Sequence, residues 1–203
     1  MDDNLTIGIL ILIIIVVAVV AAWYVLIMPA KYIRATPLEI PSISDKAEVL
    51  LLTCIDYRFF DRINAFMVEQ GYRNRYDHFV LAGSALAVTS VIPTSPGVPN
   101  VKQWQLTWQD HLGLAVDLHN IKKVIIFQHE DCAAMATYAG FNDTRADIAD
   151  INVITPAEIA FQTPYTQAAH ISIKKAYPHI EVESYIIGLQ ENIIRLAPPL
   201  IIV

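Results

Sequence analysis

An uncharged apolar run near the N-terminus constrains this chain more than any other feature. Residues 5–28 contain no acidic or basic side chain, and 23 of the 26 residues between positions 5 and 30 are hydrophobic. A helix of about 24 residues is roughly 36 Å long, enough to cross a hydrocarbon core of about 30 Å with some tilt. Trp23 and Tyr24 lie near one end, where interfacial aromatic residues are enriched. We therefore expect a transmembrane helix at residues 5–30, in contact with the lipid bilayer through residues 5–28.

Two other interpretations of this run fit the sequence less well. A cleaved signal peptide has a basic head and an apolar core of about 7–15 residues, whereas the head here, residues 1–4, is acidic and the run is longer. A buried helix that is apolar on all sides would have to be covered by protein on every side. A soluble domain of this size does not easily cover a helix of this length. Lys31 and Arg34 follow the run and no basic residue precedes it. The positive-inside rule then predicts a single-pass protein whose C-terminal domain lies on the cytoplasmic side.

The rest of the chain has the composition of one folded domain. The whole chain of 203 residues is 55% hydrophobic and 17% charged, against about 25% charged in typical soluble domains, and the apolar run accounts for this excess. Residues 31–45 contain Pro37 and Pro41 and are expected to form a linker, followed by one domain at residues 46–203. The net charge of −6 and the lack of a basic run argue against a nucleic-acid partner. Two cysteines are too few for a disulfide framework, although one bridge stays possible.

The hydrophobic pattern of this domain predicts alternating strands and helices. Continuous apolar runs are typical of strands that are buried on both faces, and recurrence every three to four residues is typical of helices. We expect strands at residues 47–53, 78–81, 123–127 and 181–187, helices at 60–70, 101–119 and 156–176, and loops at 89–100 and 143–152. Pro164 should kink or break the last helix. This order predicts an α/β fold with a mainly parallel sheet flanked by helices.

Polar residues follow two of the predicted strands at their carboxyl ends, where parallel sheets bind ligands. Cys54, Asp56 and Arg58 follow the first strand, and His129 and Cys132 follow the third. Two thiols and one imidazole favour zinc over magnesium or calcium. Three protein ligands leave one tetrahedral position open, as in catalytic zinc sites. We therefore predict that Zn²⁺ is bound by Cys54, His129 and Cys132.

Asp56 and Arg58 have a natural role beside such an ion. The carboxylate can accept a hydrogen bond from zinc-bound water, and the guanidinium can hold that carboxylate ionised and oriented. Zinc-bound hydroxide would then attack a small electrophilic carbon. The turn at Gly83 and Ser84 follows the second strand, so we expect it to lie near the substrate.

Simpler interpretations of the same residues stay open. Cys54 and Cys132 can be buried, inert thiols, and His129 can be a structural histidine. Asp56 and Arg58 can form an ion pair without a catalytic role. The neighbouring acids Glu130 and Asp131 are most simply solvated loop residues.

Cys-x-Asp-x-Arg followed by His-x-x-Cys resembles the signature of the β-class carbonic anhydrases. The similarity extends from about residue 47 to residue 189 and includes the turn that ends in Ala82-Gly83. The resemblance implies zinc ligation by Cys54, His129 and Cys132, with Asp56 and Arg58 as the catalytic dyad. It also implies reversible hydration of carbon dioxide to bicarbonate by a homodimer or higher oligomer, with active sites at the subunit interface.

This chain departs from the family's pattern at three positions. Ala133 follows the second cysteine where the family usually has glycine, Leu81 replaces an asparagine, and Tyr57 is bulkier than the residue often found there. These departures leave two alternatives open. One is a related hydrolase that acts on carbon disulfide or carbonyl sulfide, and the other is a non-catalytic structural subunit of a larger membrane-associated assembly.

Overall fold

The computed structural model describes residues 15–20, 46–89, 101–141, 154–190 and 192–199. The chain divides into two compact units, Met1–Ile43 and Ser44–Val203. In the first unit, residues 15–20 are helical and exposed. The remainder of the predicted transmembrane helix, the head at residues 1–4 and the linker at residues 31–45 lie outside the described residues. Among the helices that are described, none is both long and apolar enough to cross a membrane.

The second unit is built on one five-stranded sheet with the strand order β2-β1-β3-β4-β5. The first four strands are parallel to their neighbours, and β5 pairs antiparallel with β4. The strands are β1 (Val49–Thr53), β2 (Tyr76–Val80), β3 (Lys123–His129), β4 (Glu181–Ile187) and β5 (Ile193–Arg195). The predicted α/β fold with a mainly parallel sheet is therefore confirmed.

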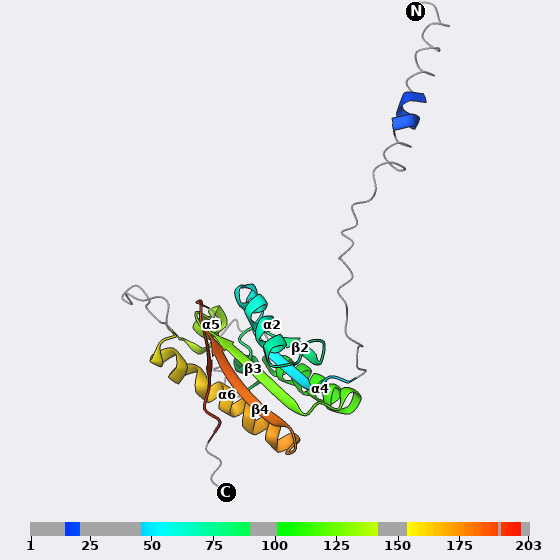
Figure 1. Ribbon diagram of the computed structural model, residues 1–203. Helices are drawn as coiled ribbons and strands as arrows, with labels where there is room; N and C mark the ends of the chain where they lie inside the picture. The colour runs from blue at the N-terminus through cyan, green and yellow to red at the C-terminus, as the bar shows by residue number, and fades with distance from the viewer. Residues whose placement is uncertain (1–14, 21–45, 90–100, 142–153, 191, 200–203) are drawn as a thin grey trace, which may run out of the picture. The chain divides into compact units, whose positions relative to one another are not determined.

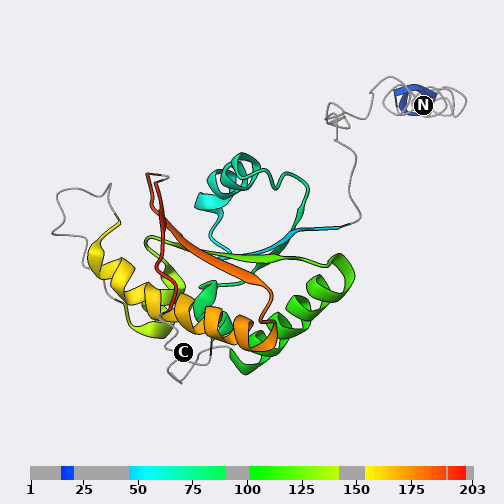
Figure 2. The same ribbon diagram turned by 60° about the horizontal axis from the view of Figure 1, so that its bottom comes forward.

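Helices cover both faces of this sheet (Figures 1 and 2). They are the short 3₁₀ helix η1 (Tyr57–Phe59) and the α-helices α2 (Phe60–Glu69), α3 (Ala85–Val88), α4 (Val101–His119), α5 (Ala133–Ala139) and α6 (Pro156–Ala176). Successive strand residues point to opposite faces, so β1 and β3 contribute to two separate cores. Leu50 and Val124 pack in the core with α4 and α6, whereas Leu51 and Ile125 pack in the core with α2.

Most of the predicted elements are confirmed, with changed boundaries at some ends. The bounds of α4, α6 and β4 agree with the prediction, while β2 begins two residues earlier and β3 extends to His129. Of the two outcomes predicted at Pro164, a kink or a break, the break is wrong, because α6 continues through this residue. Thr155 caps the start of α6 by accepting a hydrogen bond from the Glu158 N–H at 3.0 Å. Nearly all of the loops predicted at residues 89–100 and 143–152 lies outside the described residues.

Candidate metal centre

The parallel pairing of β1 and β3 brings the three predicted ligands together. Cys54 directly follows β1, His129 is the last residue of β3, and Cys132 precedes α5. Because β1 and β3 are neighbours, their carboxyl ends lie at the same edge of the sheet. The ligand atoms of Cys54, His129 and Cys132 all lie within 4.8 Å of one another. Among the described residues, this is the only cluster of three or more such side chains that could hold a metal ion.

The imidazole of His129 is oriented for metal binding. Its Nδ1 atom lies 2.8 Å from the backbone carbonyl oxygen of Glu130. A carbonyl only accepts hydrogen bonds, so Nδ1 carries the proton and the neutral ring keeps its free lone pair on Nε2. This Nε2 atom is buried and has no hydrogen-bond partner within the described part of the chain. A buried nitrogen beside two sulfur atoms is therefore available as a ligand, which fits a zinc ion.

Contact between the two thiols shifts their pKa values in opposite directions. The pKa of Cys54 is lowered to about 4, mainly because the Cys132 thiol donates a hydrogen bond to its sulfur; burial opposes this shift. The same contact raises the pKa of Cys132. The backbone N–H of Gly83 also donates to the Cys54 sulfur, at 3.2 Å. Burial lowers the pKa of His129, but the neighbouring Cys54 thiolate outweighs burial and makes the net shift upward. These pKa shifts favour a positive charge between the three side chains.

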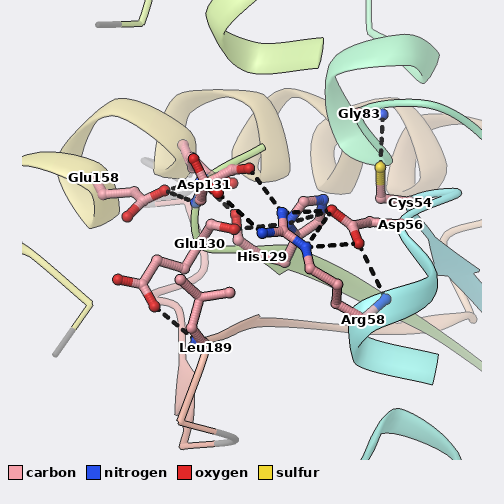
Figure 3. A network of polar contacts seen from close by, with 10 residues as sticks. Cys54, Asp56, Arg58, Gly83, His129, Glu130, Asp131, Glu158 and Leu189 are labelled. Atoms are coloured by element: carbon pink, nitrogen blue, oxygen red, sulfur yellow. Dashed lines mark hydrogen bonds and ion pairs between the residues drawn. The ribbon is translucent and has the colours of Figure 1, made fainter. Parts of the chain in front are cut away.

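Asp56 and Arg58 form a bidentate ion pair beside the cluster (Figure 3). Arg58 Nη2 lies 2.7 Å from Asp56 Oδ2, and Arg58 Nε lies 3.0 Å from Asp56 Oδ1. The carboxylate also caps η1 by accepting a hydrogen bond from the Arg58 backbone N–H at 3.1 Å. The Arg58 side chain is the main cause of the lowered pKa of Asp56. Asp56 Oδ2 lies 3.9 Å from His129 Nδ1, which places an ionised carboxylate next to the metal ligands.

Asp131 is a second partner of Arg58, which the sequence did not predict. Its carboxylate lies 3.0 Å from Arg58 Nη1, and its backbone carbonyl oxygen lies 3.2 Å from Arg58 Nη2. The Asp131 side chain is half exposed, in agreement with its predicted loop position. The guanidinium of Arg58 therefore links the segment after β1 to the turn after β3.

Glu130 is not the solvated loop acid that the sequence predicted. It is 2% exposed, and its carboxylate accepts a hydrogen bond from the Leu189 N–H at 2.7 Å. Glu158 of α6 is also buried and accepts a hydrogen bond from the Asp131 N–H at 2.8 Å (Figure 3). Neither contact was predictable from spacing, because the partners lie 59 and 27 residues apart in the sequence.

A cavity of about 590 Å³ opens beside this cluster. In addition to Asp56, Arg58 and two of the ligands, its wall includes Ile55, Tyr57, Ala82, Ala133, Thr137 and Tyr138. Gly83 and Ser84 are not part of the wall, and Ser84 is fully buried. Gly83 contacts the cluster through its N–H, whereas contact of either residue with a substrate stays a prediction.

Comparisons with known proteins give one matching family model, two sequence relatives and a similar fold. A family model described as "Putative carbonic anhydrase" matches residues 44–187. An uncharacterized protein of Rickettsia bellii is 27% identical over 146 residues, which cover 71% of this chain and 79% of the relative. An uncharacterized protein of Rickettsia conorii is 24% identical over 145 residues, which cover 71% of this chain and 69% of the relative. The structure of a carbonic anhydrase from Glaciozyma antarctica superimposes with a TM-score of 0.50 at 15% identity, over 80% of this chain and 90% of that one. At this identity, the structural likeness shows the fold alone.

Proposed function

Because the chain belongs to the carbonic anhydrase family whose model matches residues 44–187, we propose that it is a zinc-dependent lyase that reversibly hydrates carbon dioxide to bicarbonate. The observation that carries this proposal is the cluster of two thiols and one unpartnered imidazole nitrogen beside the cavity. Sulfur and imidazole ligands favour zinc over magnesium or calcium. Three protein ligands leave one position for the reacting water, as a catalytic site requires.

The side chains around the cluster suit this chemistry. A zinc ion held by Cys54, His129 and Cys132 would lower the pKa of a water molecule to about 7 and so supply a nucleophile at neutral pH. Asp56 stays ionised beside Arg58, so it can accept a hydrogen bond from that water and orient it. The apolar side chains of Ile55, Ala82 and Ala133 provide a surface for an uncharged substrate.

Replacement of Asp56 tests this assignment. In the Asp56→Asn variant the side chain keeps its size but loses its charge, and one oxygen acceptor becomes an amide donor that faces Arg58. We expect kcat/KM for carbon dioxide hydration to fall by about 100-fold or more, while zinc stays at one ion per chain. Asp61→Asn, at an exposed position in the first turn of α2, is the matched control and should keep full activity. An Asp56→Asn variant as active as the wild type would contradict the assigned role, and a zinc-loaded wild type without hydration would contradict the lyase.

We further propose that the protein works as a homodimer or higher oligomer. The support is a pair of exposed apolar side chains in the wall of the cavity. Ile55 is 65% exposed and Tyr57 is 86% exposed. Large apolar side chains that lie together on a surface are typical of interfaces. A second copy of the chain would cover these side chains and shield the cavity from water.

Attachment to a membrane through residues 5–28, with residues 46–203 on the cytoplasmic side, stays a proposal that rests on the uncharged apolar run. We expect the full chain to float with liposomes and to stay with them in alkaline carbonate. A variant with Leu10, Ile13 and Val17 each replaced by Lys should stay in the soluble fraction. Protease added to sealed inverted membranes should digest the domain if the cytoplasmic orientation is correct. Release of the unaltered chain by carbonate would contradict the anchor.

A further inference from the structure

We propose that Glu158 and Gln162 of α6 are positioning residues that hold the metal-binding turn in its ligating conformation. The metal-binding turn is defined here as residues 129–132, which begin with one ligand, His129, and end with another, Cys132. This inference deepens the proposed function, because it assigns a role to side chains that lie behind the metal cluster and outside the wall of the cavity.

The first observation is that α6 buries two polar side chains where apolar ones would be expected. Glu158 and Gln162 are one helical turn apart, so they lie on the same face of the helix, and both are 0% exposed. A carboxylate or an amide in the protein interior is destabilising unless hydrogen bonds replace its contacts with water. Glu158 and Gln162 can therefore be buried here only because they form hydrogen bonds with other groups of the protein.

Those partners include the backbone of the metal-binding turn. Glu158 Oε1 accepts a hydrogen bond from the Asp131 N–H at 2.8 Å, and Gln162 Nε2 donates to the His129 carbonyl oxygen at 2.9 Å. Gln162 Nε2 also lies 3.3 Å from Glu158 Oε1. Both oxygens act only as acceptors toward this group, which fixes the orientation of the amide. The two side chains thus bind one donor and one acceptor of a four-residue turn.

The turn has an unusual backbone conformation and is held from two sides. Asp131 has a φ of +57°, in the left-handed region that few residues other than glycine adopt, although aspartate adopts it more often than most. On the opposite side, the Glu130 N–H donates to the Ile187 carbonyl oxygen at 2.8 Å, and the Glu130 carboxylate accepts from the Leu189 N–H. Figure 3 shows Glu158 of α6 and Leu189, which follows β4, on two separate parts of the chain beside the turn. The turn is therefore held between α6 and the end of β4.

Two features of the site depend on this turn. Its first and last residues set the separation of His129 Nε2 and Cys132 Sγ, and its third residue supplies the carboxylate that binds Arg58. Groups that orient metal ligands typically change metal affinity by about 10- to 100-fold when they are removed. We therefore expect Glu158 and Gln162 to act on zinc affinity without contacting the ion.

The test compares zinc affinity among variants of the full chain, by competition with a chromophoric chelator at fixed pH. Glu158→Leu and Gln162→Leu should each raise the zinc Kd by about 10- to 100-fold. Glu158→Gln should stay within about threefold of the wild type, because its amide oxygen can still accept from the Asp131 N–H. Thr166→Val is the matched control, since Thr166 is buried on the same helix but donates to the Thr163 carbonyl oxygen. It should leave the zinc Kd unchanged, whatever it does to the melting temperature.

The outcomes separate this inference from the proposed function. Cooperatively folded Leu variants that bind zinc as tightly as the wild type would overturn the inference, and so would a Thr166→Val variant that weakens zinc equally. If Glu158→Leu does not fold, the comparison of Gln162→Leu with Thr166→Val decides the question. Weakened zinc binding in a protein that does not hydrate carbon dioxide would support the inference and contradict only the function. A wild type that binds no zinc would overturn both.

Discussion

At the scale of single residues, Arg58 organises the polar side of the cavity. Its guanidinium contacts Asp56 through Nε and Nη2 and Asp131 through Nη1. A planar group with five N–H donors can bind two carboxylates at once, whereas an ammonium group acts as a single point of charge. The Cys-x-Asp-x-Arg spacing predicted the first contact, but the second depends on a backbone conformation at Asp131 that the sequence does not reveal.

Replacing Arg58 with lysine should therefore impair the site although the charge is kept. We expect Arg58→Lys to reduce kcat/KM by about 10-fold or more, because a lysine cannot keep both oxygens of Asp56 and the Asp131 carboxylate in place. Zinc should stay at one ion per chain. Arg62→Lys is the control, because Arg62 pairs with Glu69 on α2. This variant should keep full activity. Equal activity of Arg58→Lys and wild type, measured by stopped-flow hydration, would show that charge alone is sufficient.

At the scale of elements, the site is formed where β1, β2 and β3 end side by side. The apolar patterns of β1 and β3 indicated buried strands, and the polar residues after them were correctly expected at one edge of the sheet.

The strand β5 was not predicted, because three residues are too short for a recognisable period. The role of α6 at the site was not predicted either. A glutamate and a glutamine four residues apart fit an exposed helix face equally well, and only the packing of α6 on the sheet buries them.

The turn after β2 offers a test at this scale. Gly83 has a φ of +79°, and an added Cβ would lie 3.0 Å from Leu86 Cδ2 and 3.2 Å from Ala134 Cβ. Gly83→Ala should therefore lower the free energy of unfolding by about 1–3 kcal/mol and weaken zinc binding, because the Gly83 N–H would move away from Cys54. Gly71→Ala is matched in backbone strain, with a φ of +83° and no atom within 4 Å of the added Cβ. Urea unfolding should show a larger loss for Gly83→Ala than for Gly71→Ala, and equal losses would contradict the packing argument.

At the scale of the whole molecule, the domain predicted at residues 46–203 lies within the compact unit Ser44–Val203. The apolar periodicity was sufficient to predict the α/β fold class. Alternating strands and helices bury their apolar faces in a small number of layered arrangements. The exposure of Ile55 and Tyr57 could not be predicted in the same way. Apolar residues beside a buried strand fit a core as well as a surface.

The proposed oligomer gives a prediction at this scale. Tyr57→Glu places a charge among the apolar side chains at the cavity mouth, so we expect it to shift the protein from a dimer or larger species to a monomer. Leu118→Glu is the control, because Leu118 is 67% exposed on α4 and does not line the cavity. Light scattering after size-exclusion chromatography would measure both masses. A monomeric wild type, or a Tyr57→Glu variant of unchanged mass, would contradict an interface at the cavity mouth.

The central claim of this account is that Cys54, His129 and Cys132 hold one zinc ion. X-ray absorption spectroscopy of the zinc-loaded chain measures this arrangement directly. We predict two sulfur ligands at about 2.3 Å and two nitrogen or oxygen ligands at about 2.0–2.1 Å, with one sulfur lost in Cys54→Ser. A zinc ion surrounded only by nitrogen and oxygen, or a spectrum that Cys54→Ser leaves unchanged, would contradict the claim.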